Sequence, residues 1–199
     1  MKTCHQTPFS SRRRRGFTLV ELLIVIAVIA ILASLAFPAL QSALLAAQKA
    51  QANSMAQNLK GAMTTYITDY GRFPAIGTAN SDTLITDATD WTTVSAMLNG
   101  GLNVDDLTDN DDAKDLNPRQ IVYHSFSRDD ITGSSGVQPH VVSPFSNQEL
   151  YTMQFDNDYD GILNALPTKD GETIKLRTDV AVWLVDPNDT SSSLVNTFE

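Results

Sequence analysis

Residues 16–40 decide the fold, and they read GFTLVELLIVIAVIAILASLAFPAL. Among the nineteen positions 22–40 only Ser34 is plainly polar, and no charged side chain occurs between Glu21 and Lys49. An α-helix rises about 1.5 Å per residue, so a run of about 20 apolar residues crosses the hydrocarbon core of a bilayer. The stretch therefore predicts a membrane-spanning helix.

The sequence before this run is basic. Lys2 and the four arginines at 12–15 precede Phe17, and no acidic residue does. Positive charge stays on the cytoplasmic side of a membrane. The N-terminus is therefore expected in the cytoplasm, and the C-terminal bulk of the chain is expected on the other side.

Two simpler interpretations of the apolar run are a secretory signal peptide and a plain membrane anchor. A signal peptide has an apolar stretch of about 7–15 residues, which is shorter than the one in this chain. A plain anchor leaves Glu21 unexplained, because a carboxylate in an apolar helix costs about 2.5–3.5 kcal/mol at the bilayer centre and so needs a partner.

The hexapeptide from Gly16 to Glu21 resembles the processing motif of type IV pilins and pseudopilins. The resemblance implies that a prepilin peptidase cuts the chain after Gly16 and methylates the new amine of Phe17. It also implies that Glu21 neutralises the N-terminal amine of a neighbouring subunit during assembly. Physical chemistry agrees, since a buried carboxylate is tolerable when a cation pairs with it.

The resemblance extends to Pro38 and to the turn after the helix. Pilins of this family often carry a helix-distorting proline here, and proline removes one intrahelical hydrogen bond. Major pseudopilins of type II secretion often end their long helix with a Tyr and an Asp/Asn-Gly-x-aromatic-Pro turn. Residues 66–74, YITDYGRFP, are similar to that pattern, which favours a pseudopilin over a pilus subunit.

Beyond Pro38 the apolar residues recur at spacings of three and four, which predicts one helix from about 17 to about 70. Gly71 and Pro74 then form a normal helix stop. The expected fold class is α+β and type IV pilin-like. Its long N-terminal helix, half of it transmembrane, would pack on a small antiparallel β-sheet.

The region after the helix is expected to be rich in loops. One short helix is predicted around 91–98, with Asp90 as its N-cap. The aspartate-rich segment 105–115 is expected to be a solvated, mobile loop, and the tail after Asp186 is expected to fray. Strands are predicted at 121–126, 150–155 and 173–185.

These expectations divide the chain into four segments. They are a cytoplasmic leader peptide that is removed (1–16), a hydrophobic transmembrane and assembly helix (17–44), an amphipathic helix with its stop turn (45–74), and an acidic globular periplasmic domain with an aspartate loop (75–199).

Charge and cysteine content limit the function classes. The net charge is −9, and loss of residues 1–16 would leave 9 basic and 23 acidic residues, a net charge of −14. Such an acidic domain is not expected to bind nucleic acid; metal cations or basic surfaces are better partners. The only cysteine, Cys4, lies in the predicted leader, so the mature chain would form no disulfide.

The sharpest chemical motif outside the N-terminus is the stretch DNDYDGI at 156–162. Its carboxylates and glycine have the spacing of the front half of a calcium loop, in which a backbone carbonyl adds a further ligand. The predicted ligands are the side chains of Asp156, Asp158 and Asp160 and the carbonyl of Ile162.

The back half of an EF-hand loop is missing, because its twelfth position is Pro167 instead of Glu. Asp170 and Glu172 are candidates for later ligands, and a metal-free turn rich in Asp and Asn is the alternative. The resemblance adds that major pseudopilins of type II secretion lack the disulfide of pilins and bind calcium in a C-terminal loop. Ca²⁺ is therefore the expected cofactor.

No catalytic site is expected. The histidines His5, His124 and His140 are isolated in the sequence, and no glycine-rich phosphate loop or zinc spacing occurs. The chain is therefore not expected to be an enzyme.

The expected function is a structural subunit of a pseudopilus filament in type II protein secretion, in the bacterial inner membrane. The expected partners are other copies of the chain, the prepilin peptidase, the inner-membrane assembly platform, minor pseudopilins and the membrane. One alternative is a type IV pilus or competence-pilus subunit. The other is a membrane-tethered, calcium-dependent binding domain that never polymerises.

Overall fold

The computed structural model describes residues 16–76, 81–127, 130–132, 140–145, 151–167, 172–186 and 189–198. The chain forms two compact units, Met1–Leu44 and Leu45–Glu199. The predicted leader lies outside the described residues except for Gly16, and so does Cys4.

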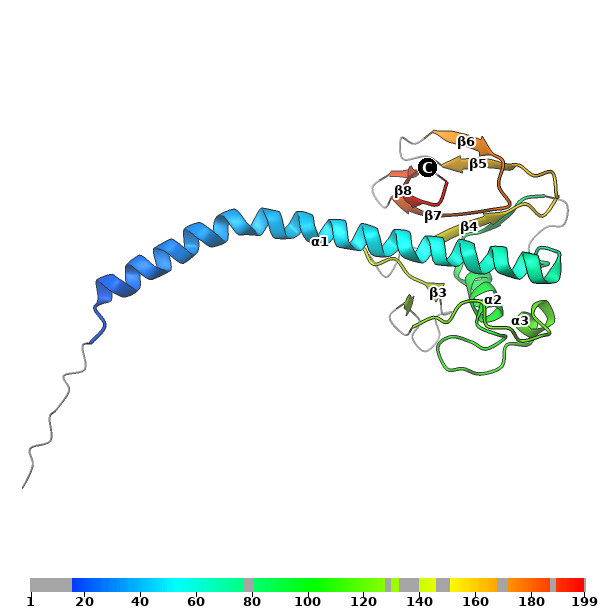
Figure 1. The fold of residues 1–199 in the computed structure, drawn as a ribbon, viewed down its shortest axis with the longest axis horizontal. Coiled ribbons are helices and arrows are strands. Elements are labelled where there is room, and N and C mark those ends of the chain that lie inside the picture. Colours follow the sequence, from blue (N-terminus) through cyan, green and yellow to red (C-terminus); the bar gives the residue numbers. More distant parts are fainter. Residues whose placement is uncertain are drawn as a thin grey trace, which may run out of the picture. The chain divides into compact units, whose positions relative to one another are not determined.

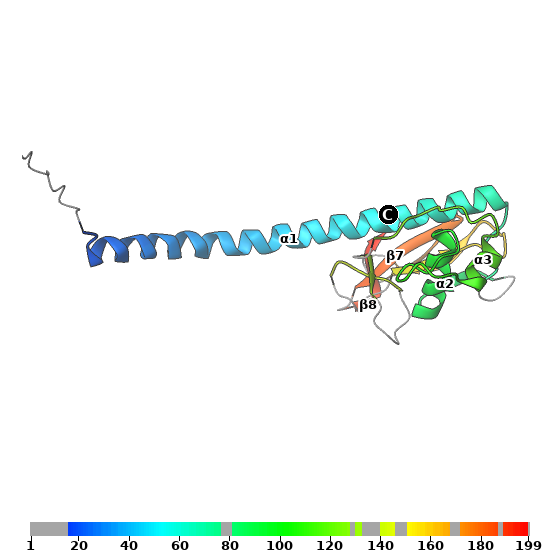
Figure 2. The same cartoon turned by 90° about the horizontal axis from the view of Figure 1, so that it is seen from below.

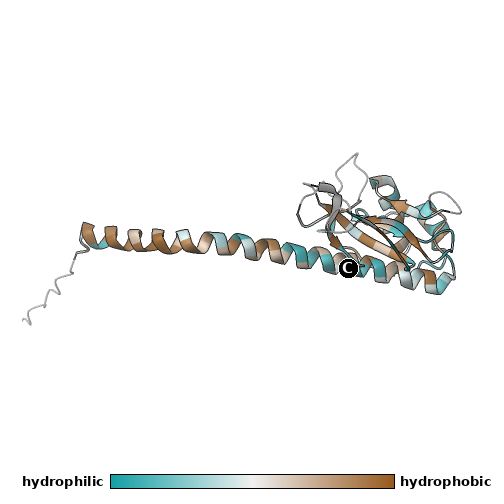
Figure 3. Cartoon of the chain, turned by 90° about the horizontal axis from the view of Figure 1, so that it is seen from above, coloured by the Kyte–Doolittle hydropathy of each residue, from teal (hydrophilic) through white to brown (hydrophobic). Residues whose placement is uncertain are grey.

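Helix α1 spans Leu19–Tyr70 and contains 52 residues, which confirms the predicted long helix. In the first unit every residue from Gly16 to Leu44 is exposed, and Figure 3 shows that this part of the helix is mostly apolar. Its large apolar side chains are between 46% exposed, at Val25, and 78% exposed, at Leu19. By length and composition, α1 can cross a membrane.

A four-stranded antiparallel sheet organises the second unit. Its strand order is β1 (Thr83–Ile85), β4 (Tyr151–Phe155), β7 (Val180–Asp186) and β8 (Asp189–Asn196). Figures 1 and 2 both show β7 running beside the C-terminal half of α1. This arrangement confirms the predicted α+β fold of a long helix on an antiparallel sheet.

The contact face of α1 in this unit is built largely from small residues. The buried positions are Ala52, Ala56, Leu59, Ala62, Met63 and Tyr66. Alanine side chains let a sheet approach the helix backbone closely, and the larger residues fill the remaining space of the core. The apolar recurrence predicted beyond Pro38 therefore faces the core only from Met55 onward, because Leu44 and Leu45 are exposed.

The sheet has a core on each face. In β7 the side chains of Val180, Val182 and Leu184 join the core with α1. Ala181 and Trp183 point to the other face, as the twofold period of a strand requires. There they meet Leu163 and Leu166 of the hairpin formed by β5 (Leu163–Pro167) and β6 (Thr173–Leu176).

A third pair of strands is very short. It consists of β2 (Ile131–Thr132) and β3 (His140–Val141), which pair antiparallel. Val141 is buried in the core that contains α1, so this pair packs against that core.

The predicted short helix is α2, Ala88–Leu98, but its expected N-cap was wrong. Asp87 is the cap: its backbone is extended and its carboxylate accepts a 2.8 Å hydrogen bond from the amide of Asp90. Asp90 instead lies in the first turn, where a negative charge is favourable near the positive end of the helix dipole. The helix ends at Leu98 with Asn99 as its C-cap, and Gly100 and Gly101, which follow it, both have positive φ.

The strand expected at 121–126 does not form. Val122 makes only an isolated bridge to Asn99, and the amides of Tyr123 and His124 both donate to the carbonyl of Leu98 at the end of α2. The buried Asn117 side chain accepts from the Ile121 amide and donates to the Ile121 carbonyl. These bonds take up the backbone groups that a strand ladder would need.

The tail after Asp186 is also ordered differently from the expectation. Residues 189–196 form β8, which pairs with β7 and closes its otherwise open edge. The tail then contacts α1, because the Lys60 ammonium donates to the Thr197 carbonyl at 3.3 Å. The predicted fraying was therefore wrong for these residues.

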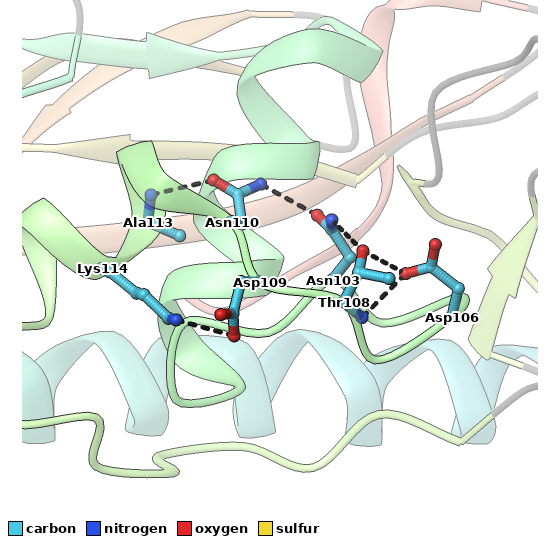
Figure 4. A network of polar contacts seen from close by, with 7 residues as sticks. All are labelled: Asn103, Asp106, Thr108, Asp109, Asn110, Ala113 and Lys114. Atoms are coloured by element: carbon cyan, nitrogen blue, oxygen red, sulfur yellow. Dashed lines mark hydrogen bonds and ion pairs between the residues drawn. The ribbon is translucent and has the colours of Figure 1, made fainter.

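Half of the aspartate-rich segment is helical instead of a loop. Helix α3 spans Asp111–Leu116, and the side chain of its N-cap, Asn110, accepts a 2.9 Å bond from the Ala113 amide. Asp111 and Asp112 lie in its first turn, which complements the helix dipole. Figure 4 shows the preceding turn, where the Lys114 ammonium lies 2.6 Å from a carboxylate oxygen of Asp109.

Candidate functional site

The start of α1 is a capping box formed by Thr18 and Glu21. The Thr18 amide and hydroxyl both donate to Glu21 Oε2, at 2.9 and 2.8 Å, and the Glu21 amide donates to Thr18 Oγ1 at 3.2 Å. This is the reciprocal S/T-x-x-E arrangement that satisfies helix N-terminal amides. The sequence analysis missed it, although the spacing of the two residues was readable.

The capping box fixes where the Glu21 carboxylate lies. Its Oε2 is occupied by Thr18, and the side chain stays exposed at the first turn of α1. Phe17, the predicted new N-terminal residue, is 76% exposed and directly precedes Thr18. A charged amine at residue 17 would therefore lie at the same end of the helix as this carboxylate.

Gly16 has no structural reason to be glycine. A Cβ atom built on it meets nothing within 4 Å, and its φ is not in the left-handed region. The fold of the described residues therefore does not require glycine here, and the predicted role of Gly16 in processing stays a prediction.

Pro38 lies inside α1, which continues on both sides of it. Its ring removes one backbone donor from the helix. Its predicted role in assembly concerns packing between subunits and stays a prediction.

The aspartate loop is wound around the carboxylate of Asp156, which is only 3% exposed. Asp156 Oδ2 accepts a 2.8 Å bond from the Gly161 amide, and Oδ1 accepts one of 3.2 Å from the Asp160 amide. Tyr159 and Gly161 have φ values of 60° and 77°, which allow this tight winding. Burial raises the pKa of Asp156 above its ordinary value, although the Gly161 bond opposes the shift.

A third carboxylate reaches this loop from a distant part of the chain. Carboxylate oxygens of Asp82, Asp156 and Asp158 all lie within 4.8 Å of one another. The strand register explains the meeting, because β1 begins at Thr83, which pairs with Phe155 at the end of β4. Asp82 and Asp156 are thereby neighbours across the ends of these two strands.

Asp82 has one satisfied and one unsatisfied oxygen. Its Oδ2 accepts bonds from the Asn164 amide at 3.1 Å and from the side chains of Asn164 and Gln154 at 3.3 Å each. Its Oδ1 is buried and has no hydrogen-bond partner in the described part of the chain. A buried oxygen without a hydrogen-bond partner raises the free energy of the folded state. A cation bound at this oxygen would remove that cost.

The other predicted ligands lie outside this group. The Asp160 carboxylate is exposed, and its Oδ1 accepts a 2.7 Å bond from the Ile162 amide. The Ile162 carbonyl accepts a bond from the Asn164 side chain. Of the later candidates, Glu172 is exposed and Asp170 lies outside the described residues.

The group of Asp82, Asp156 and Asp158 fits a hard divalent cation. Ca²⁺ takes six to eight oxygen ligands at about 2.3–2.6 Å, of which carboxylates, carbonyls and water are the usual sources. Three carboxylates within 4.8 Å supply half of that shell. A cation would offset the mutual repulsion of these carboxylates.

Comparison with known proteins identifies the N-terminal segment. Residues 11–37 match the prokaryotic N-terminal methylation motif. The chain carries a type IV pilin-like N-terminus. The matched segment contains the predicted processing residues and most of the apolar run at 22–40.

Curated relatives agree with this result. The chain is 46% identical over 62 residues to the fimbrial protein EcpC of Eikenella corrodens, which covers 31% of this chain and 40% of that protein. It is 42% identical over 66 residues to the type IV major pilin protein PilE1 of Neisseria gonorrhoeae, covering 33% and 40%. It is 40% identical over 66 residues to a fimbrial protein of Neisseria meningitidis serogroup A, covering 33% and 39%.

The chain thus spans about 40% of the length of these relatives. No solved structure is significantly similar to the chain. The relatives are pilins and fimbrial proteins, so they support the predicted resemblance to type IV pilins but not its narrower form, a pseudopilin. They also agree with the prediction that the chain is a structural protein and not an enzyme.

Proposed function

We propose that the chain is a filament subunit of the type IV pilus kind. It is made as a precursor that a prepilin peptidase cuts after Gly16 and methylates on Phe17. The observation that carries the proposal is the methylation motif at 11–37, placed at the start of an exposed apolar helix. The similarity to type IV major pilins supports a pilus over a secretion pseudopilus.

The proposed assembly step follows from the surface of α1. Before assembly, residues 19–44 lie in a membrane, with the C-terminal unit on the periplasmic side. In the filament, the same apolar surface packs against other copies of the chain. The Glu21 carboxylate pairs with the amine of Phe17 of a neighbouring subunit, which sets the register of one helix against the next.

The Glu21 side chain provides the most direct test of this step. We expect Glu21→Ala to be cut and to stay in the membrane without forming filaments, because the amine of the neighbouring subunit loses its partner. Filaments sheared from cells are counted by electron microscopy, and cleavage is followed by the mass of the membrane-bound protein.

The matched control is Asp115→Ala, which removes an exposed carboxylate of α3 in the second unit. This variant should assemble normally. Normal filaments from Glu21→Ala would contradict the proposed pairing, and a Glu21→Ala chain that is not cut would assign Glu21 to processing instead.

A subunit of a type II secretion pseudopilus is the second candidate. It is favoured by the YITDYGRFP turn and by the absence of cysteine from residues 17–199. In the structure this turn contacts the aspartate loop, since Tyr159 Oη accepts a 3.2 Å bond from the Phe73 amide and the two rings lie 5.1 Å apart.

Deletion of the gene separates the two candidates. A pilus subunit predicts loss of twitching motility or DNA uptake with unchanged protein secretion. The opposite result, lost secretion with normal motility and uptake, would replace the pilus proposal by the pseudopilus one. The wild-type gene supplied in trans is the control for both assays.

We also propose that Asp82, Asp156 and Asp158 hold a divalent cation, with Ca²⁺ the best chemical fit. The support is the orphaned, buried Oδ1 of Asp82 beside the buried carboxylate of Asp156. A cation there joins the start of β1 to the loop after β4, and so stabilises the end of the sheet that contacts the turn after α1.

Thermal unfolding of the full chain in detergent micelles tests the cation site. Ca²⁺ at 100 times its dissociation constant should add about 2.7 kcal/mol to the free energy of unfolding. Asp82→Asn should abolish this response, whereas Asp160→Asn should keep it, because the Asp160 carboxylate lies outside the group.

The two variants also distinguish the structure-based ligand set from the local motif. Loss of the response in Asp160→Asn and its retention in Asp82→Asn would restore the motif's own carboxylates as the site. Absence of any Ca²⁺ response in the unmodified chain would remove the metal proposal.

A further inference from the structure

A cavity of about 400 Å³ lies beside α1 in the second unit, away from the aspartate loop. One wall is a face of α1 that carries Gln51, Ser54 and Asn58, and another carries His124 and Asp130. The volume lies within the range of about 300–1,000 Å³ that is usual for sites that bind small molecules. Neither the filament nor the cation proposal uses this cavity.

Among the described residues that line the cavity, Asp130 is the only Asp, Glu, Lys or Arg. It is held in place by its neighbours: Oδ2 accepts a 2.8 Å bond from the Ser127 amide, and its carbonyl accepts a 3.0 Å bond from the Val142 amide. Within the described ranges the only ion pair is Lys114 with Asp109, so Asp130 has no cationic partner there. The carboxylate is therefore held in place by two hydrogen bonds to its segment and has no ion pair within the described ranges.

The remaining polar side chains that α1 contributes to the wall are neutral, and each can act as an acceptor as well as a donor. The carboxamides of Gln51 and Asn58 and the hydroxyl of Ser54 each offer an oxygen acceptor. Burial lowers the pKa of His124, although the charge of Asp130 opposes the shift. The surroundings of His124 therefore disfavour its cationic form.

This chemistry excludes several ligand classes. The carboxylate repels anions, and the described residues that line the cavity include no Lys or Arg to offset that repulsion. A hard metal ion needs six to eight oxygen ligands around one point, which a single carboxylate in a cavity of this size does not supply. An ammonium ion has three donors and no acceptor, which matches a wall of one carboxylate and several neutral acceptors.

The apolar part of the lining extends the match beyond the charge. Met55, Val142 and Pro144 complete the cavity, and they suit the methylene groups of a short alkyl chain. We propose that this cavity binds an alkylammonium group, with Asp130 as its ionic partner and the acceptors of α1 around it. The group comes either from a free amine or from the lysine side chain of another copy of the chain.

Binding of n-butylammonium to the full chain in nonionic detergent tests the proposal, with 1-butanol as the uncharged probe of the same length. Charge-assisted hydrogen bonds predict at least about tenfold tighter binding of the ammonium probe, measured by titration calorimetry at low salt. Equal binding of the two probes, or no binding of n-butylammonium, would overturn the proposal.

Two variants locate the site. Asp130→Asn keeps the acceptor for the Ser127 amide and should lose the preference for the ammonium probe. Asn58 is an exposed helix residue whose side chain makes no hydrogen bond to the described part of the chain. Asn58→Leu should also weaken binding. Asp115→Asn removes one charge elsewhere and should change nothing. An unchanged preference in Asp130→Asn, with a normal unfolding transition, would contradict the assignment.

Assembled filaments distinguish the two sources of the ammonium group. If the cavity takes free amines, n-butylammonium binds filaments and dispersed subunits equally. If a lysine of a neighbouring copy fills the cavity, the probe binds only dispersed subunits. This comparison depends on filament formation, whereas the binding test on dispersed subunits does not, so failure of the filament proposal leaves that test intact.

Discussion

The apolar surface of the first 26 residues of α1, with one carboxylate at its start, is the constraint on which the rest of the structure depends. Each large apolar side chain gains about 1.5–3 kcal/mol when it leaves water, and this segment exposes a continuous series of them. Lipid or other copies of the chain must therefore cover it. The Thr18–Glu21 capping box holds the carboxylate at the helix end, where a neighbouring amine can pair with it.

In the second unit the same helix packs against the sheet. There its buried face changes to alanines with Leu59, Met63 and Tyr66, so that the sheet packs closely against it. The sequence predicts α1 and β4 well because their apolar patterns are long or strong. It predicts one strand at 173–185, which the structure divides into β6 and β7 in two different sheets. It does not predict β8, whose Ser-rich strand forms because β7 offers an open edge, and it does not place the N-cap of α2 at Asp87, one turn before the apolar run begins.

The aspartate loop shows which members of the carboxylate group a local sequence motif predicts and which it does not. The D-x-D-x-D-G spacing points to Asp156 and Asp158 as candidate ligands, because these two residues are close both in the chain and in space. It does not find Asp82, which joins them only through the pairing of β1 with β4. It includes Asp160, whose carboxylate bonds its own loop instead. Likewise, no local pattern brings Asp130 to the face of α1 that carries Gln51 and Asn58.

The proposed assembly depends on cleavage after Gly16, because only a free amine at Phe17 gives Glu21 a cation to pair with. The intact mass of the subunit isolated from its filaments tests this central claim most directly. The account predicts a chain that begins at Phe17 and carries one added methyl group. A filament subunit whose mass still includes residues 1–16 would contradict it.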